Sequence, residues 1–179
     1  MKDFRYIRPR SSAEAAQLME AGKAARLHAG GVDLLDRMKE RLDEPDLLVG
    51  QLDASGMDFA GIDEDGDIRI GARVTLTQLA ESDVIRRFLP TLDQAAGDAA
   101  SPQLRNRATL GGNLAQHTRC GYYRLKSFPC LKRGDDTCPV LADGAVQETA
   151  GIFANRPCAC APPSSLAPAL GAAGAVLRV

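Results

Sequence analysis

The residues with the clearest chemical potential are five cysteines confined to the last third of this 179-residue chain: Cys120, Cys130, Cys138, Cys158 and Cys160. The first four are separated by nine, seven and nineteen residues, with no C-x-x-C pair, so zinc ribbons and bacterial-type ferredoxin sites are poor matches. In a reducing compartment, such a group favours metal or redox chemistry over a disulfide framework. Spacing alone leaves a metal site and a set of free thiols as equal alternatives.

Two glycine pairs form a second group of candidates. Residues 29–33 (AGGVD) follow a predicted strand and open a predicted helix, so their backbone N–H groups can converge on an anion. In residues 109–113 (TLGGN), the Thr109 hydroxyl and the Asn113 amide flank the glycines and can bond phosphate or ribose oxygens. Two such loops suit a ligand with two phosphates, although each can also be an ordinary turn. Neither is the G-x-G-x-x-G of a Rossmann NAD site.

The first half of the chain predicts the elements that must position these loops. Residues 4–9 read as a short strand, and Ser11 with Glu14 forms a capping box that starts a helix ending at Gly22. A strand over 25–31, a helix over 32–42 and a strand over 46–50 follow. This alternation predicts a small α/β unit with parallel pairing.

A second unit is expected after a boundary between Leu52 and Gly61. Residues 63–67 read as a turn, residues 67–74 as a half-buried strand, and Thr75 with Gln78 caps the next helix. Helical pieces are expected at 85–88 and 92–100, and a loop over 101–116. Beyond Cys120 the many Gly, Pro, Asp and Lys residues predict a long loop, before a last helix, a glycine turn and the beginning of a strand.

Composition narrows the function classes. The net charge of −1 and pI near 6.1 provide no basic field for nucleic acid or an anionic membrane surface, so neither partner is expected. Aromatic residues make up 4% and Trp is absent, which disfavours base-stacking and carbohydrate-binding platforms. No signal sequence or apolar stretch of membrane-spanning length is present in these residues, so a cytoplasmic location is expected.

Three segments in order, HAGGVDLLDRMK, IGARVTLTQL and SPQLRNRATLGGNLAQ, resemble the FAD-binding (medium) subunits of the xanthine dehydrogenase and molybdenum hydroxylase family. The resemblance covers residues 4–116 and implies an α+β fold of the PCMH or vanillyl-alcohol-oxidase type. It implies a small α/β FAD-binding subdomain over 1–55 and a second, incomplete α+β subdomain over 56–179. The residues that it implies at the FAD site are Ala29, Gly30, Gly31, Val32, Asp33, Ser101, Thr109, Gly111, Gly112 and Asn113.

The segment RCGYYRLKSFPCLKRGDDTC resembles an insertion, here about residues 117–160, in the branch of this family related to aldehyde oxidoreductases. There, four cysteines hold a 4Fe-4S cluster, which implies Cys120, Cys130, Cys138 and Cys158 as ligands and leaves Cys160 over.

Four cations lie close to the cysteines in sequence and either offset cluster charge or only keep the loop soluble: Arg124, Lys126, Lys132 and Arg133. His28 and His117 are expected to be structural, with His117 as a cluster ligand the alternative. Pro162, Pro163, Ser164 and Ser165 stand where the family has histidine, proline, serine and aspartate.

The resemblance implies an electron-transfer subunit of an oxidoreductase complex, without catalytic residues of its own. Electrons would pass from a molybdopterin-binding large subunit and a 2Fe-2S small subunit to FAD, and then to an external acceptor. The family continues for more than a hundred residues past this point, so we expect a C-terminally short subunit, with a separate chain supplying the remainder as one alternative. The competing hypotheses are an iron-sulfur scaffold subunit that no longer binds FAD, and a small zinc protein.

Overall fold

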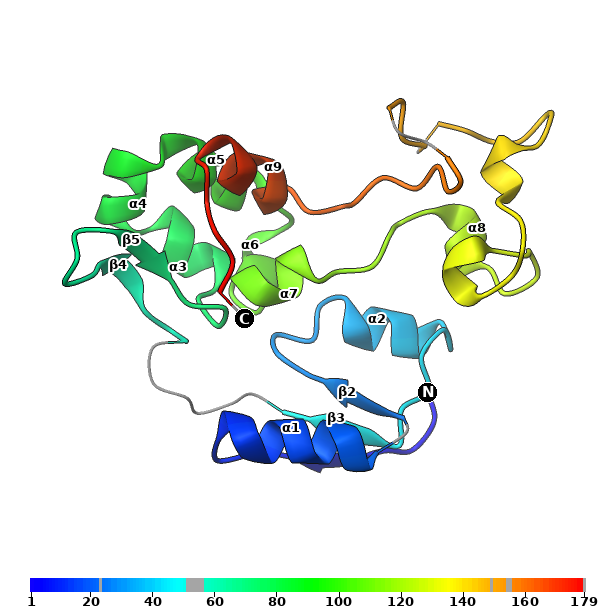
Figure 1. Cartoon of the computed structure of the whole chain (residues 1–179), viewed down its shortest axis with the longest axis horizontal. Coiled ribbons are helices and arrows are strands. Elements are labelled where there is room, and N and C mark those ends of the chain that lie inside the picture. Colours follow the sequence, from blue (N-terminus) through cyan, green and yellow to red (C-terminus); the bar gives the residue numbers. More distant parts are fainter. Residues whose placement is uncertain (23, 51–56, 149, 154–155, 179) are drawn as a thin grey trace.

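The computed structural model describes residues 1–22, 24–50, 57–148, 150–153 and 156–178. Its N-terminal part is a three-stranded parallel sheet with one helix on each face (Figure 1). The elements, in chain order, are β1 (Arg5–Ile7), α1 (Ser12–Ala21), β2 (Ala25–Leu27), α2 (Leu34–Lys39) and β3 (Leu47–Val49). The strand order is β1-β3-β2, so the central strand is the last of the three in sequence.

Alternation along the central strand explains why both faces of the sheet are covered. Leu47 and Val49 pack with Ala15 and Ala25 beneath α1, whereas Leu48 points to the other face and packs against α2. Ser11 caps α1 by accepting a hydrogen bond from the Glu14 N–H at 3.1 Å. The predicted α/β unit with parallel pairing is therefore present.

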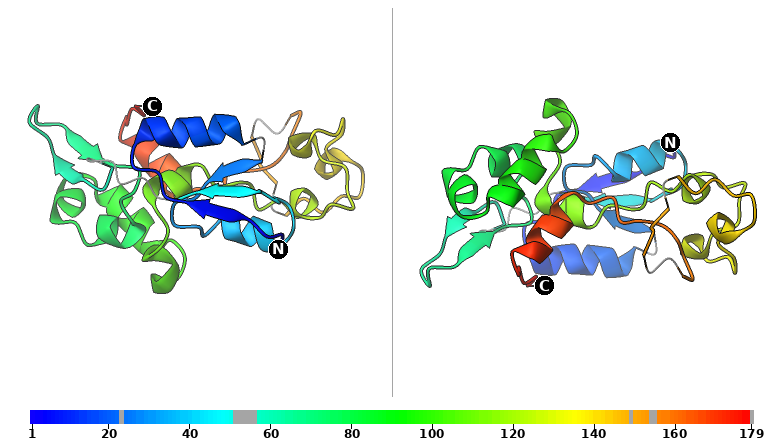
Figure 2. Two further views of the ribbon diagram at one scale, coloured as in Figure 1. Left: turned by 90° about the horizontal axis from the view of Figure 1, so that it is seen from below. Right: turned by 90° about the horizontal axis from the view of Figure 1, so that it is seen from above.

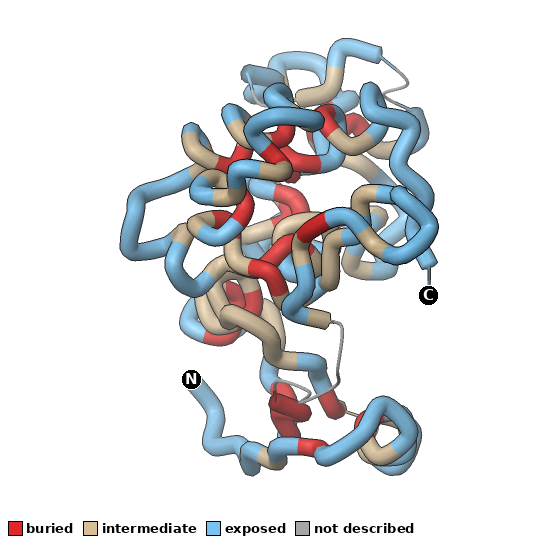
Figure 3. Tube along the Cα trace, turned by 90° about the vertical axis from the view of Figure 1, so that its left-hand side faces the viewer, coloured by how far each residue is buried: buried red, intermediate tan, exposed pale blue. Residues whose placement is uncertain are grey.

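The second part of the chain pairs a hairpin with a helical layer. Its elements are β4 (Ala60–Ile62), β5 (Ile68–Ile70), α3 (Leu76–Ala80), α4 (Asp83–Phe88), α5 (Pro90–Asp98), α6 (Pro102–Arg105), α7 (Leu110–Leu114) and α9 (Leu166–Ala172). Strands β4 and β5 are antiparallel. The buried core is apolar and draws on α3, α4, α5, α7 and α9, with Val74, Leu79, Ile85, Leu92 and Leu166 at most 1% exposed. In Figure 3 the buried residues lie inside each part and the outer loops are exposed.

Between α7 and α9 the chain makes a long excursion, which carries all the cysteines. Its described residues contain α8 (Gly121–Arg124) and two 3₁₀ turns, Leu131–Arg133 and Pro139–Leu141, as their only helical elements. Figure 2 shows this excursion at one end of the molecule and the β4–β5 hairpin at the other. We call residues 117–160 the cysteine segment. The expected long loop is thus confirmed, and contacts described below hold its first residues close to α2.

Three local expectations were wrong. Residues 101–116 contain α6 and α7 instead of a loop, because Ser101 and Thr109 each cap a helix with their side-chain oxygen. Strand β4 was missed because its central residue is Gly61, which weakens a strand pattern. Residues 175–178 form no strand. The predicted boundary begins in residues 52–56, which lie outside the described part of the chain. In the part described, no helix is long and apolar enough to cross a membrane.

Candidate functional site

The first glycine loop (residues 29–33) leaves β2 and enters α2. Gly31 has φ of +79°, a backbone conformation that glycine adopts without steric cost. Among the described residues, the N–H groups of Gly30, Gly31, Val32, Asp33 and Leu34 donate no internal hydrogen bond. A run of unsatisfied donors at a helix start, on a loop that is only half-buried, is the arrangement that binds an anionic group. These donors suit an anionic group such as a diphosphate, which is the group that the resemblance implies at this loop.

Gly30 also brings the first glycine loop against the second half of the chain. A Cβ at this position would lie 1.7 Å from the Arg107 carbonyl oxygen and 2.6 Å from the carbonyl carbon. Only a residue without a side chain permits this approach. The segment just before the second glycine loop (residues 109–113) is consequently in contact with the first loop.

The second glycine loop is more internally bonded than the first. The N–H groups of Leu110 and Gly111 donate to the carbonyls of Val74 and Ala72 at 2.8 and 2.9 Å. The buried Thr109 hydroxyl accepts from the Gly112 N–H at 3.1 Å, so its oxygen caps α7. Its backbone donors are therefore used by the fold, and ligand contacts from this loop are left to side chains.

Asn113 and Ser101 differ in what they can offer a ligand. The Asn113 carboxamide oxygen accepts a 2.6 Å hydrogen bond from the Ser164 hydroxyl, which leaves the amide nitrogen as its donor. Ser164 in turn accepts from the Ala167 N–H at 3.0 Å and so joins α7 to α9. Ser101 caps α6 and makes no hydrogen bond to either glycine loop among the described residues. The structure therefore brings Asn113, but not the Ser101 side chain, into the network around the loops.

The position of Asp33 in the first glycine loop suggested a contact with the ligand, but its carboxylate is bound by other groups of the protein. One oxygen accepts from Arg37 Nε at 3.0 Å and from the His117 N–H at 3.1 Å. The other accepts from Arg124 Nη2 at 3.3 Å. The side chain of Asp33 is 12% exposed, so its ion pairs with Arg37 and Arg124 are largely buried. Only its backbone N–H remains for a diphosphate.

These ion pairs continue into α2 and the cysteine segment, and we call the whole group the Asp33 cluster. Its four cations and four carboxylates are Arg26, Arg37, Arg119, Arg124, Asp33, Asp36, Glu40 and Asp43. Burial raises the pKa of Asp36, but hydrogen bonds from Arg124 and Arg119 outweigh it and lower the pKa overall. Sequence reasoning assigned Arg124 no definite role and overlooked Arg37 and Arg119. The acidic face of α2, with Asp36 and Glu40 at helical spacing, was the available signal.

His28 lies at the rim of the first glycine loop. Its Nε2 is 2.7 Å from the position that a Cβ of Gly31 would take, and its buried Nδ1 has no hydrogen-bond partner within the described residues. Burial, and then the charge of Arg107, lower the pKa of His28. His28 therefore remains neutral at pH 7 and leaves a polar atom next to the loop. His117 instead stacks on the Tyr123 ring, with centroids 6.0 Å apart.

The five cysteines are all reduced. Cys138 and Cys160 lie near enough to Cys158 to influence the pKa of its thiol. Burial raises the pKa of Cys158, but the hydrogen bonds from Cys160 and the Lys132 charge outweigh it and lower that pKa. Cys130 is buried, and its N–H donates to Asp135 at 2.7 Å. Across the described ranges, no three His, Cys, Asp or Glu side chains are arranged to hold a metal ion. The thiols match the donor type of an iron-sulfur cluster, but their placement does not form a closed site.

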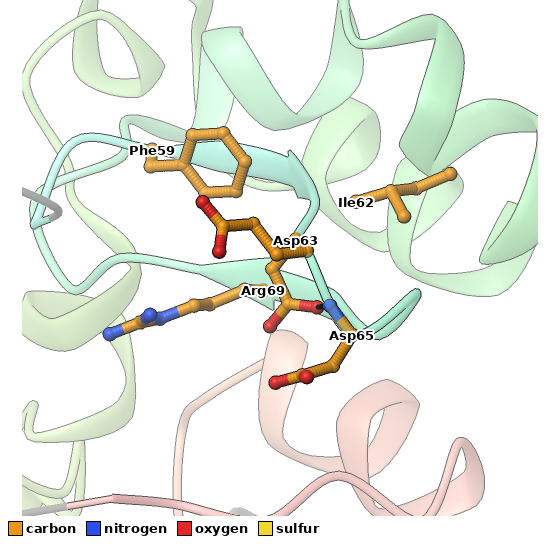
Figure 4. Close-up of a pocket in the computed structure, with 6 residues that line it drawn as sticks. Phe59, Ile62, Asp63, Asp65 and Arg69 are labelled. Carbon is orange, nitrogen blue, oxygen red and sulfur yellow. Dashed lines mark hydrogen bonds between the residues drawn. The ribbon is translucent and has the colours of Figure 1, made fainter.

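Two cavities lie outside the glycine loops. One, of about 420 Å³, has mainly apolar walls that include Tyr122, Phe128 and Val140, with Cys120 and Cys160 also lining it. The other, of about 530 Å³, lies on the β4–β5 hairpin between Phe59, Arg69 and the acidic turn (Figure 4). Asp63 in that turn accepts from the N–H groups of Asp65 and Asp67, so it closes the hairpin. No predicted site residue lines this second cavity.

Two glycine loops on an α+β fold define a candidate nucleotide-binding protein. Comparison with known proteins identifies the family to which it belongs. The family model described as the FAD binding domain in molybdopterin dehydrogenase matches residues 2–179. The chain therefore belongs to this family, and proteins similar to it include subunits of xanthine, carbon monoxide and aldehyde oxidoreductases or dehydrogenases.

Individual relatives agree with that assignment. The aldehyde oxidoreductase FAD-binding subunit PaoB of Escherichia coli K12 is 36% identical over 178 residues, which are 99% of this chain and 56% of that protein. Among solved structures, Cu,Mo-CO dehydrogenase matches with a TM-score of 0.57 at 39% identity, over 64% of this chain and 40% of that one. Quinoline 2-oxidoreductase from Pseudomonas putida 86 matches with a TM-score of 0.59 at 32% identity, over 63% and 39%. The chain thus spans about half, or less, of the length of these relatives.

Proposed function

We propose that this chain binds FAD and serves as the flavin-carrying electron-transfer subunit of a molybdenum hydroxylase or dehydrogenase complex. The observation that carries the proposal is the run of unsatisfied N–H groups from Gly30 to Leu34 beside the second glycine loop. A diphosphate accepts hydrogen bonds from such a run without needing a cationic side chain. Membership of a family defined by FAD binding supports the same ligand.

In this proposal the first glycine loop holds the diphosphate through the main chain of residues 29–33. The Asn113 amide, and the Thr109 hydroxyl hydrogen, are the polar groups of the second loop that remain available to the ligand. Gly111 allows α7 to begin close to Ala72, and a Cβ at Gly112 would lie 3.0 Å from the Thr109 hydroxyl oxygen. For Ser101 we propose only a supporting role, through its cap on α6. The PCMH or vanillyl-alcohol-oxidase type of fold, with subdomains over 1–55 and 56–179, is part of the same proposal.

Bound FAD would supply redox chemistry that exchanges electrons in steps of one or two. The chain itself orients the cofactor and sets its electrostatic surroundings. The proposed partners are a molybdopterin-binding large subunit and a 2Fe-2S small subunit, and the substrate then belongs to the large subunit. The match to an aldehyde oxidoreductase subunit over 178 residues favours an aldehyde oxidoreductase type of complex.

For the cysteine segment we propose a 4Fe-4S cluster with Cys120, Cys130, Cys138 and Cys158 as ligands. The support is the donor chemistry, the nearness of Cys138 to Cys158, and a match to the aldehyde oxidoreductase subunit long enough to include this segment. Cluster formation requires the thiols to move closer together than they lie in this structure. No electron path is assigned through the cluster.

The test is flavin and iron quantification on the protein purified with its native partners. We expect FAD, released by denaturation, at about one per chain, together with iron that is lost in Cys130→Ser and kept in Cys160→Ser. Iron without flavin would overturn the FAD proposal and favour the scaffold alternative. Unchanged iron in Cys130→Ser would remove Cys130 from the ligand set, and zinc in place of iron would exclude the cluster.

A further inference from the structure

Arg124 joins two parts of the chain that are far apart in sequence, the cysteine segment and the stretch formed by the first glycine loop and α2. Its guanidinium donates to Asp36 Oδ2 at 2.8 Å, to Glu40 Oε2 at 2.9 Å and to Asp33 Oδ1 at 3.3 Å. Its Nε donates to the Thr118 carbonyl at 3.4 Å, which closes the start of the cysteine segment around the side chain. One arginine therefore ties the cysteine segment to both α2 and the first glycine loop.

The contact with Asp33 is largely withdrawn from water. The side chains of Arg124 and Asp33 are 11% and 12% exposed, and that of Arg37, on the other side of Asp33, is 7% exposed. Removing one partner from a buried ion pair leaves the other charge without compensation, which is strongly unfavourable. The Asp33 carboxylate therefore depends on Arg124 and Arg37 for charge compensation in this position.

Asp33 is also a carboxylate inside the loop that is proposed to receive a diphosphate. An uncompensated negative charge there would repel the ligand, and at short range within a protein such repulsion is large. Arg124 and Arg37 both neutralise the carboxylate and hold it on the side that faces α2 and the cysteine segment. Among the described residues, the N–H groups of the loop donate no hydrogen bond to this carboxylate, so they stay available to a ligand.

We propose that Arg124 is a positioning residue for the FAD site, which makes FAD binding depend on the placement of the cysteine segment through Asp33. This inference rests on the proposed function, because it takes FAD as the ligand of the first glycine loop. Coupling between two sites is reciprocal, so FAD must stabilise the start of the cysteine segment by the same factor. The two cofactor regions of the chain are then assembled together.

The experiment compares FAD dissociation constants by quenching of flavin fluorescence. We expect Arg124→Met to raise the constant about tenfold or more, in the usual range for coupled sites. Arg124→Lys restores only part of the affinity, because the compact ammonium lacks the planar, five-donor fork with which the guanidinium reaches Asp33, Asp36 and Glu40 together. Arg119→Met is the matched control. Its side chain is 47% exposed and lies 3.9 Å from Asp33, so affinity stays within about twofold of wild type.

A second substitution separates charge compensation from general damage to the fold. Asp33→Asn removes the charge but keeps an oxygen that accepts from Arg37 and from the His117 N–H. Adding Asp33→Asn to Arg124→Met is therefore expected to recover most of the lost affinity. Unchanged affinity in Arg124→Met, or no recovery in the double variant, overturns the proposal. Failure of wild type itself to bind FAD overturns the proposed function instead.

A measurement on wild type alone covers the case in which Arg124→Met does not fold. Hydrogen exchange at residues 117–124 is compared with and without FAD, and with riboflavin, which lacks the diphosphate. We expect FAD, but not riboflavin, to slow exchange in this stretch. Equal exchange with and without bound FAD refutes the coupling.

Discussion

Gly30 is the position at which the two halves of the proposed FAD site touch, so Gly30→Ala is the sharpest test of that contact. The new Cβ would lie 1.7 Å from the Arg107 carbonyl oxygen, whereas ordinary contact begins at 3.4 Å. The obstacle is backbone, so the loops must separate by about 1.7 Å, and overpacking of this kind costs on the order of 1–3 kcal/mol. For a chain of this size we expect the melting temperature to fall by roughly 2–12 °C, with weaker FAD binding.

The matched control is Gly171→Ala in α9. A Cβ there meets nothing within 4 Å, and the position carries no positive φ, so the substitution is expected to stabilise the helix by about 0.5–1 kcal/mol. Both variants are followed by thermal unfolding and by FAD titration. If Gly30→Ala melts at the same temperature as wild type and binds FAD equally well, the close approach of Gly30 to Arg107 is not a feature of the protein in solution.

Three further predictions address the scaffold. Thr75→Ala removes the oxygen that accepts from the Gln78 N–H in the capping box of α3, and is expected to lower the unfolding free energy by about 1 kcal/mol in urea titrations. Ser164→Ala leaves Asn113 and the Ala167 N–H without their shared buried partner, for a loss of about 1–3 kcal/mol; a loss near zero would mean that α7 and α9 are not joined there. Burial lowers the pKa of both His28 and His117 in the folded chain, and the charges of Arg107 and Arg37, respectively, lower it further. As the pH drops below about 6.5, the unfolded chain therefore binds protons before the folded chain does, and the free energy of unfolding decreases. In the double variant His28→Gln and His117→Gln, the free energy of unfolding should decline less between pH 7 and 5.5. An unchanged decline would mean that other groups cause the pH dependence.

Local signals in the sequence were sufficient for most of the elements. Ser11 and Thr75 start helices where their caps predict them, and the apolar run of Leu47, Leu48 and Val49 forms the central strand because it is buried on both faces. The second glycine loop misled the prediction, because Gly111 and Gly112 are poor helix formers. The buried cap of Thr109 and the bonds of Leu110 and Gly111 to the preceding strand region outweigh that preference.

The charged cluster could not be predicted from the sequence for a different reason. Arg124 reaches Asp33 across 91 residues, and no local pattern encodes a pairing at that separation. The sequence offered only cations near the cysteines and acids on one face of α2. The resemblance placed Asp33 in the FAD loop, but only the folded chain shows that its carboxylate is occupied by Arg37 and Arg124.

The central claim is that the main chain of residues 29–33 binds the diphosphate of FAD. It is tested most directly by titrating the flavin-free protein with FAD and, in parallel, with riboflavin, which has the same ring but lacks the diphosphate and the adenosine attached to it. Binding of FAD at one per chain, at least about a hundredfold tighter than riboflavin, is the expected result, since several charge-assisted hydrogen bonds are lost with the diphosphate. Equal affinities for the two flavins, or no binding of FAD, would contradict the account.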